Sequence, residues 1–418
     1  MQAQAHQQGR GRTSSRPHAP MIRIDSDSPD IRAALTDLAA TIESHGGRAH
    51  PAATCTAAGG DLTITADGEI ASGARLMAVP ETCLPPVEAF ELTVRAGAFA
   101  IDTVVDEVTA SERAAFDGML AVYNACGKPA FWRTVCPWFT LGQDVDVLDK
   151  LIAGRAGAAK FTKFRDLAAA GDTDALLVRS FLGSRTFSLK EQGETTTGAQ
   201  RMQPVLMPFI DFLNHHFGAR AYQLNADAAD GPRTLWTCAD RPVPGSQECF
   251  VRYNVMDRLD AFLSYGFLDA SAPFVASVPV RLALPGGVEI EVRGEGGGPF
   301  KGKLPGKAQD LRLFMPQIRA RREDYVAVQR LLITGDQAPY ALRRVLTLLV
   351  SMCRPKGTEG NLQEAVKAAE AQLLHANAQY YDDLASLVTA AQARSDLSDP
   401  PAGRSETLRT VAALCAVQ

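Results

Sequence analysis

Helical and strand-type periodicity occupy separate blocks of this chain, and this separation constrains the fold more than any other feature of the sequence. Apolar residues at helical spacing run through 31–47, which ends at a Gly pair. Short alternating segments follow at LTITADG and ARLMAVP, and helical spacing returns from about 84 to 175. Strand and loop signals fill 176–293. Blocks arranged in this way predict an α+β fold.

Two further stretches suggest where domains begin and end. The Gly- and Pro-rich stretch GEGGGPFKGKLPGK, residues 294–307, predicts a linker or exposed loop. Helical spacing then begins at RLFMPQIRARREDYVAVQRLLITG, so we expect residues 308–418 to form an all-α domain. Residues 1–21 contain no acidic residue and few that could pack, which predicts a disordered tail. The remaining part, 22–293, is expected to be one domain with a helical insertion at about 84–175.

Composition excludes several classes of function. A net charge of −4 gives no reason to expect nucleic-acid binding, and no apolar run reaches the length of a membrane span. The eight Cys form no CxxC pair, which argues against a structural zinc site or a disulfide framework. Buried free thiols in a reducing compartment are the simpler interpretation. We therefore expect a cytoplasmic monomer that binds neither nucleic acid nor membrane.

Two apparent motifs, a phosphate-binding loop and a metal site, can be rejected. Gly297 and Gly302-Lys303 have the spacing of a phosphate-binding loop, but Leu304 replaces the Ser or Thr that holds magnesium, and Pro305 opposes the helix that should follow. The adjacent pair at 215–216 is no metal site either, because neighbouring His side chains usually point apart and no further ligand lies at tight spacing. We expect no metal.

Three segments carry the residues that chemistry could use. They are GSRTFSL (183–189), MPFIDFLNHHFG (207–218) and QECFVRYNVMDRLDAFLSYGFLD (247–269). The second places four polar groups in an otherwise apolar run. Each segment alone has a structural explanation: the Arg could form a surface ion pair, the Asn and His could cap a turn, and the Tyr residues could be core aromatics.

Together and in this order, the three segments resemble the SET-domain protein methyltransferases. The similarity is greatest to the branch of the Rubisco large-subunit lysine methyltransferase, which also contains the actin histidine methyltransferase. EIASGARLMAVPE (69–81) is similar to the early strands of that family, and AFWRTVCPWF resembles the aromatic stretch of its helical insertion. The resemblance implies a SET-domain β-fold with a threaded, knot-like segment and a helical insertion, followed by an all-α domain that docks a protein or peptide substrate.

The resemblance also implies a cofactor, S-adenosylmethionine, and the residues that hold it. Arg185 would pair with the carboxylate of the cofactor. Asn214 and His215 would hold its methionine and adenine parts through backbone and amide hydrogen bonds. Asp211 would brace this segment or tune the acceptor, and we count it with the cofactor-binding residues. His216 has no role in the family pattern.

Two tyrosines would form the catalytic part of the site. Tyr253 would direct its hydroxyl toward the transferred methyl group and the nucleophile, and Tyr265 would form a wall of the channel for the acceptor side chain. Methyl transfer to nitrogen depends on alignment and desolvation, worth roughly 7–11 kcal/mol in good cases. It needs no strong base beside the nucleophile, because a low-dielectric channel already favours the neutral amine.

One segment departs from the family pattern. Relatives carry a glycine-containing motif near the start whose backbone wraps the cofactor, and Gly60-Asp61-Leu62-Thr63 stands at that place here. One glycine is shifted and another is replaced. We assign Gly60, Asp61 and Leu62 to cofactor binding on this alignment.

The sequence thus leads to a protein-lysine Nε-methyltransferase, with two alternatives. The same fold could methylate histidine or another nitrogen. The chain could also be a degenerate SET module that binds a partner without catalysis, which the altered motif at 60–63 would favour.

Overall fold

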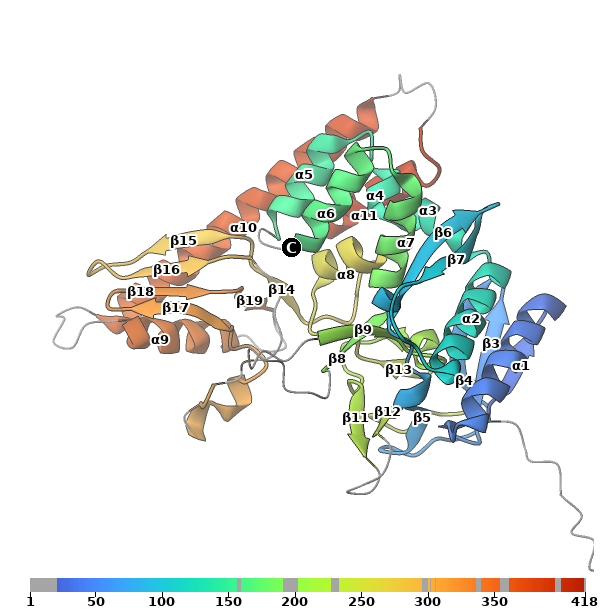
Figure 1. The fold of residues 1–418 in the computed structure, drawn as a ribbon. Coiled ribbons are helices and arrows are strands. Elements are labelled where there is room, and N and C mark those ends of the chain that lie inside the picture. The colour runs from blue at the N-terminus through green and yellow to red at the C-terminus, as the bar shows by residue number, and fades with distance from the viewer. Residues whose placement is uncertain are drawn as a thin grey trace, which may run out of the picture.

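The computed structural model describes most of the chain beyond its first twenty residues (Figure 1). The described residues are 21–155, 159–190, 202–226, 233–294, 300, 302–304, 306–335, 340–353, 361–394 and 400–416. The tail predicted over 1–21 lies outside them except for Met21. This residue does not belong to a disordered tail, because its apolar side chain is buried in the main core and its backbone nitrogen donates to Glu43 Oε2 at 3.3 Å.

The chain first forms a three-stranded sheet with a helix beside it. The strands pair in the order β1-β3-β4, with β1 parallel to β3 and β3 antiparallel to β4. The elements are β1 (Arg23–Ser26), α1 (Pro29–Ser44), β3 (Ala53–Ala58) and β4 (Asp61–Ala66). Ser28 caps α1 by accepting from the N–H of Ile31. The helix predicted over 31–47 and the strand predicted at LTITADG are both confirmed.

A four-stranded antiparallel sheet joins early and middle segments in the order β11-β12-β5-β2. Its strands are β2 (Arg48–Ala49), β5 (Arg75–Pro80), β11 (Gln223–Ala226) and β12 (Arg233–Cys238). Three two-stranded pairs complete this part: β6 (Phe90–Arg95) with β7 (Ala98–Val104), β8 (Thr186–Lys190) with β9 (Met202–Leu206), and β10 (Asn214–His215) with β13 (Phe250–Val251). The β10–β13 pair is parallel and sets the Asn-His segment beside the one that leads to Tyr253.

Helices fill most of the insertion predicted at about 84–175. They are α2 (Ala110–Ala125), α3 (Lys128–Val135), α4 (Pro137–Thr140), α5 (Val145–Ala153), α6 (Ala159–Ala169) and α7 (Thr173–Gly183). Residues 90–104 of this stretch form the hairpin β6–β7 instead, since alternation rather than helical spacing governs FELTVR and AFAIDTV. Both Trp of AFWRTVCPWF are buried, and the indole of Trp138 donates to the carbonyl of Leu263 in α8 (Arg258–Tyr265) at 3.2 Å.

The C-terminal third is not all-α. It contains β17 (Ile318–Arg322), β18 (Tyr325–Val328), β19 (Leu332–Thr334), α9 (Ala341–Cys353), α10 (Leu362–Ala393) and α11 (Arg404–Ala416). The sheet order β15-β16-β18-β17 adds β15 (Val280–Ala283) and β16 (Glu289–Val292), and β19 pairs with β14 (Phe274–Ala276). The helical prediction was wrong over these strands because IRARREDYVAV alternates apolar and polar residues and ends in β-branched and aromatic types.

The stretch predicted as a linker contributes to a second core. Phe300 and Leu304 are buried there, with apolar side chains that extend from Leu282 to Leu373. This core therefore starts before the predicted boundary at 293, because β15 and β16 supply one side of it. Of the stretch 294–307, residues 295–299, 301 and 305 lie outside the described part.

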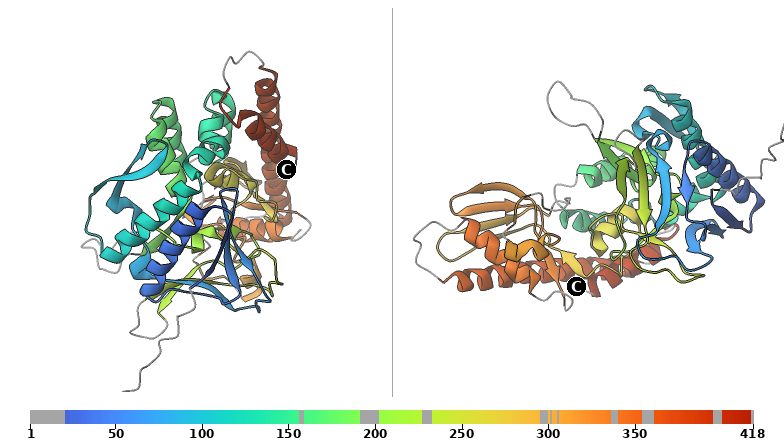
Figure 2. Two further views of the ribbon diagram at one scale, coloured as in Figure 1. Left: turned by 90° about the vertical axis from the view of Figure 1, so that its right-hand side faces the viewer. Right: turned by 90° about the horizontal axis from the view of Figure 1, so that it is seen from below.

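Helix α10 joins the two cores. It is 32 residues long and runs along both parts of the molecule (Figure 2). Its first half, including Val366 and Leu373, packs in the second core, and its second half, including Tyr380 and Leu384, packs in the main core. The mixed α+β character predicted from the sequence is confirmed.

Candidate active site

A cavity of about 330 Å³ lies where β4, the α2–α3 turn and the end of α8 meet, a volume typical of small-molecule pockets. Its lining consists of Asp61, Leu62, Thr63, Tyr123, Lys128, Phe131, Val135, Arg185, Asp211, Phe212, Asn214, Tyr265, Gly266 and Phe267. A larger cavity, of about 770 Å³, lies between Met21 and Ala53 and contains none of the predicted site residues.

The smaller cavity gathers most of the predicted site residues from segments that are far apart in the sequence. The predicted residues that line it are Asp61, Leu62, Arg185, Asp211, Asn214 and Tyr265. The predicted residues outside its lining are Gly60, His215 and Tyr253. Tyr253 packs beside Tyr265, and Gly60 and His215 are the chain neighbours of Asp61 and Asn214, which line the cavity.

A buried carboxylate stands at the centre of the lining. Asp211, in the short 3-10 helix Ile210–Phe212, is 4% exposed, and its Oδ2 accepts from the hydroxyl of Tyr123 at 2.8 Å. Arg185 Nη1 lies 3.6 Å from the same oxygen. Burial raises the pKa of Asp211 to about 6, against the opposing effect of the Arg185 charge and the Tyr123 hydrogen bond. This carboxylate therefore titrates near neutral pH.

Arg185 has an unused donor. Its Nε is buried and has no hydrogen-bond partner among the described residues, while its guanidinium carbon lies 5.3 Å from the centroid of the Phe181 ring. Burial works against the charged form, but Asp211 and the nearby tyrosines raise the pKa of the guanidinium, so it stays charged. A buried charged donor without a partner is costly. A ligand with an anionic oxygen would satisfy it.

Asn214 lines another side of the cavity and is held by a glutamate outside the lining. Asn214 Nδ2 donates to Glu248 Oε1 at 2.5 Å. Glu248 stands just before β13, and β13 runs parallel to the strand that contains Asn214. The amide is thereby held at the rim of the cavity.

His215 is a buried connector rather than part of the cavity wall. Its Nδ1 accepts from the backbone N–H of Tyr253 at 3.0 Å, so Nε2 carries the proton that it shares with Asp269 Oδ2, also at 3.0 Å. Burial tends to raise the pKa of Asp269, but hydrogen bonds from His215 and Ser271 lower it. The ring thus fixes the course of the chain on both sides of Tyr253.

The two predicted catalytic tyrosines lie side by side, with ring centroids 5.3 Å apart. Tyr265 lines the cavity, whereas the hydroxyl of Tyr253 donates to the carbonyl of Leu213 at 2.8 Å. Burial raises the pKa of Tyr253 and raises that of Tyr265 to about 12. Both phenols are therefore protonated at neutral pH, and they can donate hydrogen bonds but cannot serve as bases.

The altered motif at 60–63 is supported by the turn between α2 and α3. Gly60 has φ +85°, and a Cβ there would lie 2.6 Å from the carbonyl oxygen of Cys126, so only glycine fits. Lys128 Nζ pairs with Asp61 Oδ1 at 3.0 Å. Lys128 is 8% exposed, and its ammonium lies 5.3 Å from the centroid of the Phe131 ring. The helical segment thus holds this loop against the cavity.

Sequence reasoning missed several residues of the site. Tyr123 and Lys128 gave no signal, because they lie in a helical stretch and reach the cavity only through tertiary packing. Glu248 and Asp269 were within the third segment, where an acid five residues before Tyr253 and another four after Tyr265 could have been noted.

The described residues contain no group of three or more His, Cys, Asp or Glu that could hold a metal ion. The eight Cys are free, and all but the half-buried Cys415 are buried, which confirms the expectation of buried thiols. None of the helices in the described part combines the length and apolarity needed to cross a membrane.

No protein-family model matches the chain, and no curated protein matches its sequence. Among solved structures, it is similar to the SET domain of LSMT bound to lysine and AdoHcy, with 13% identity, 93% of this chain and 92% of that chain covered, and a TM-score of 0.36. For the same domain bound to MeLysine and AdoHcy, the identity is 12%, 92% of this chain and 91% of that chain are covered, and the TM-score is 0.38. For Rubisco LSMT bound to AdoMet, the identity is 12%, 92% of each chain is covered, and the TM-score is 0.34. At identities and TM-scores this low, the similarity assigns the chain neither a family nor an activity.

Proposed function

We propose that this chain is an S-adenosylmethionine-dependent protein N-methyltransferase of the SET type that methylates a lysine Nε. The supporting observation is that the motif residues Arg185, Asn214 and Tyr265 line one cavity together with the 61–62 segment. The buried, unpartnered Nε of Arg185 supports a ligand that carries a carboxylate. The threaded segment stays a prediction.

The residues present fit the cofactor. Arg185 would hold its carboxylate, Asn214 and the backbone of His215 would hold its methionine and adenine parts, and the loop at 61–62 would cover it. When bound, S-adenosylmethionine supplies an electrophilic methyl group on a positively charged sulfur. Asp211 would brace Arg185 through the 3.6 Å ion pair rather than contact the cofactor.

The chain's own contribution to the reaction is positioning. Tyr265 and Tyr253 would orient the acceptor nitrogen, and their aromatic rings tolerate a methylammonium group through cation–π attraction. Because both phenols have raised pKa values, neither takes a proton from the acceptor. The acceptor would therefore enter as the neutral amine, which a low-dielectric channel favours.

Calorimetry of S-adenosylmethionine binding tests the cofactor assignment. Wild-type protein should bind, and Asn214→Ala should bind at least tenfold more weakly because it loses the amide at the cavity rim. Thr36→Ala, an exposed change on α1, is the control and should bind as the wild type does. Equal affinity in Asn214→Ala would remove the assignment.

Transfer of a tritiated methyl group into a cell lysate, followed by mass spectrometry of the labelled residue, tests the activity. Label on lysine supports the proposal, and label on histidine would replace it with the alternative acceptor. Tyr253→Phe should keep the cofactor and lose most of the transfer.

A non-catalytic binding module is the second candidate. It is favoured by the altered motif at 60–63 and by the Tyr253 hydroxyl, which bonds to Leu213 and lies outside the cavity lining. Cofactor binding without transfer to any lysate protein would support it.

The remaining expectations belong to the same proposal. A protein or peptide substrate would dock on residues 308–418, although these include strands as well as helices. The protein would act as a cytoplasmic monomer.

A further inference from the structure

Tyr265 depends on its helix for its place at the cavity. It is the last residue of α8, and within the described residues its hydroxyl makes no hydrogen bond. Its ring lies beside the rings of Tyr253 and Phe267, at 5.3 and 5.9 Å between centroids. By contrast, the hydroxyl of Tyr253 is tied to Leu213. Whatever fixes α8 therefore fixes Tyr265.

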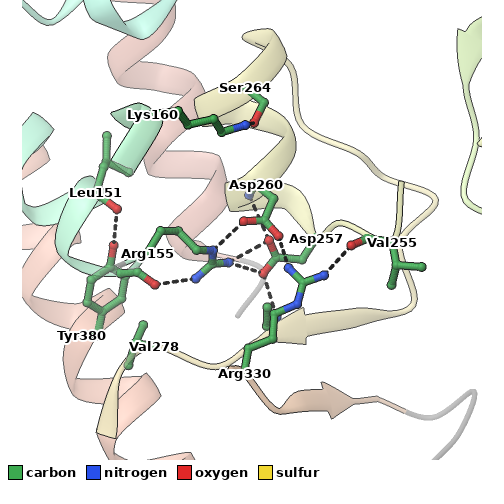
Figure 3. A network of polar contacts seen from close by, with 12 residues as sticks. Leu151, Arg155, Lys160, Val255, Asp257, Asp260, Ser264, Val278, Arg330 and Tyr380 are labelled. Atoms are coloured by element: carbon green, nitrogen blue, oxygen red, sulfur yellow. Dashed lines mark hydrogen bonds and ion pairs between the residues drawn. The ribbon is translucent and has the colours of Figure 1, made fainter. Parts of the chain in front are cut away.

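The first turn of α8 is held by a buried arginine from the helical segment (Figure 3). Arg155, between α5 and α6, is 1% exposed. Its Nη2 donates to both oxygens of Asp257 at 2.7 and 2.6 Å, and its Nε donates to Asp260 Oδ1 at 2.7 Å. Asp257 is also the N-cap of α8, where it accepts from the backbone N–H of Asp260.

A second arginine reaches the same turn from the C-terminal third. Arg330, between β18 and β19, is 7% exposed. It donates to Asp260 Oδ2 and to the carbonyl of Val255. The backbone N–H of Ala276 in β14 donates to Asp257 Oδ2 at 2.7 Å. Three regions of the chain therefore meet at the start of α8.

Two buried cations face two buried carboxylates, so the charges balance. Burial tends to raise the pKa of Asp260, but Arg155 and Arg330 outweigh it and lower the pKa to about 2. Asp260 is thus charged at neutral pH, and removing one arginine would leave a carboxylate of this cluster with fewer cations beside it. At the other end of the helix, Lys160 Nζ donates to the hydroxyl of Ser264 at 2.9 Å, next to Tyr265.

We propose that Arg330, acting through Asp260, is a positioning residue for Tyr265, so that the C-terminal third sets the geometry of the site. Loss of Arg330 would leave Asp260 with one cation instead of two and would remove the direct contact between the β18–β19 connection and the first turn of α8. Because α8 moves as one short helix, about 12 Å long at 1.5 Å per residue, a tilt at its first turn displaces its last residue. This inference rests on the proposed function only in calling Tyr265 part of a catalytic site.

The test uses the full chain labelled with 3-fluorotyrosine and observed by ¹⁹F NMR. The resonance that disappears in Tyr265→Phe identifies Tyr265 among the eight tyrosines. In Arg330→Gln this resonance should shift or broaden, while in Arg330→Lys, which keeps a cation near Asp260, it should return toward the wild-type position. Arg344→Gln removes an exposed ion pair with Asp310 in the same third of the chain and should leave it unchanged.

Methyl transfer is measured in the same variants. Arg330→Gln should lower kcat at least tenfold with the KM for S-adenosylmethionine within about threefold of wild type, and Arg330→Lys should recover part of the loss. If Arg330→Gln does not fold, Arg330→Gln/Asp260→Asn, which removes one charge of each sign, takes its place. An unmoved Tyr265 resonance in a folded variant overturns the inference. Lack of cofactor binding in wild-type protein would instead count against the proposed function, and the NMR result would still decide the positioning role.

Discussion

Arg155 and Arg185 have opposite kinds of surroundings in this molecule. Arg155 is surrounded by acceptors: two carboxylates and the carbonyl of Gly154 take its donors at 2.6 to 2.7 Å. Arg185 faces one carboxylate at 3.6 Å and leaves its Nε without a partner in the described part of the chain. The first arrangement is complete without a ligand, and the second is not. The contrast separates a structural ion pair from a prepared binding site: Arg155 is fully enclosed, whereas the Arg185 side chain is 24% exposed.

The largest effect should come from removing the saturated arginine. Arg155→Met leaves Asp257 and Asp260 buried without their shared cation, which costs about 3–5 kcal/mol of unfolding free energy for a broken buried pair. Urea denaturation monitored by circular dichroism measures this loss of unfolding free energy. Arg409→Met, which removes an ion pair with Glu406 that is about 70% exposed on both sides, should cost less than about 1 kcal/mol. Equal losses in the two variants would break the comparison.

Asp211 should make stability depend on pH in a direction unusual for a carboxylate next to an arginine. Its folded-state pKa of about 6 lies above the unfolded value near 4, so the folded state binds its proton more tightly. The contribution of Asp211 to stability is therefore full below about pH 4 and is lost as the pH rises through 6, by up to about 3 kcal/mol.

Urea denaturation of wild type and Asp211→Asn at pH 4, 5, 6 and 7 checks this dependence. The unfolding free energy of Asp211→Asn should increase relative to that of the wild type as the pH rises. Asp260, whose pKa is lowered to about 2, should act in the opposite direction: its contribution is present above about pH 4 and is lost as the pH falls toward 2. If the difference in unfolding free energy between wild type and Asp211→Asn were the same at all four pH values, Asp211 would be paired as fully as Asp260.

Arg185→Met should affect binding more than folding. Hydrogen bonds to charged groups are worth about 1.5–3 kcal/mol, so S-adenosylmethionine should bind roughly 10- to 150-fold more weakly. The unfolding free energy should change less than in Arg155→Met, because Asp211 can become protonated when its cation is removed. Calorimetry and urea denaturation measure the two quantities, and Arg113→Met, an exposed pair with Asp117, is the matched control. A loss of stability as large as that of Arg155→Met would contradict the distinction.

The smallest effect is expected at Lys128. Its partner Asp61 is 75% exposed, so Lys128→Met should cost at most about 1 kcal/mol of stability. Since the pair holds the 60–62 loop at the cavity, the affinity for S-adenosylmethionine should still fall several-fold. Lys163→Met, on the exposed face of α6, should change neither quantity. An unchanged affinity in Lys128→Met would limit the prepared site to Arg185 and Asn214.

The sequence predicted the parts of the site that depend on local pattern. The segments around Arg185, Asn214 and Tyr265 were singled out by residue type and order, and the structure brings all three to one cavity. Tyr123 and Lys128 could not be found in this way, since an amphipathic helix gives the same pattern whichever pocket its polar residues face. The network around Arg155 was equally invisible, because its members are separated by about one hundred residues and meet only through packing.

In the fold, too, the elements with a clear local pattern were predicted and those set by long-range pairing were not. Helix α1 and strands β4 and β5 follow from short periodic segments with clear stop signals. Strands β17–β19 were missed because the strand-type alternation of IRARREDYVAV is short and lies among apolar residues that also suit a helix, and pairing with β16 and β14 decides between the two. That pairing is a long-range property that no window of the sequence contains.

The division of α10 between two cores has a consequence for how the protein is made. Tyr380 and Leu384 belong to the main core, and Val366 and Leu373 belong to the second one, yet all four lie in this one helix. During synthesis, neither core can close until this helix has left the ribosome, so the apolar surfaces of both remain open together. We therefore expect chaperones to engage the nascent chain at least until α10 has emerged.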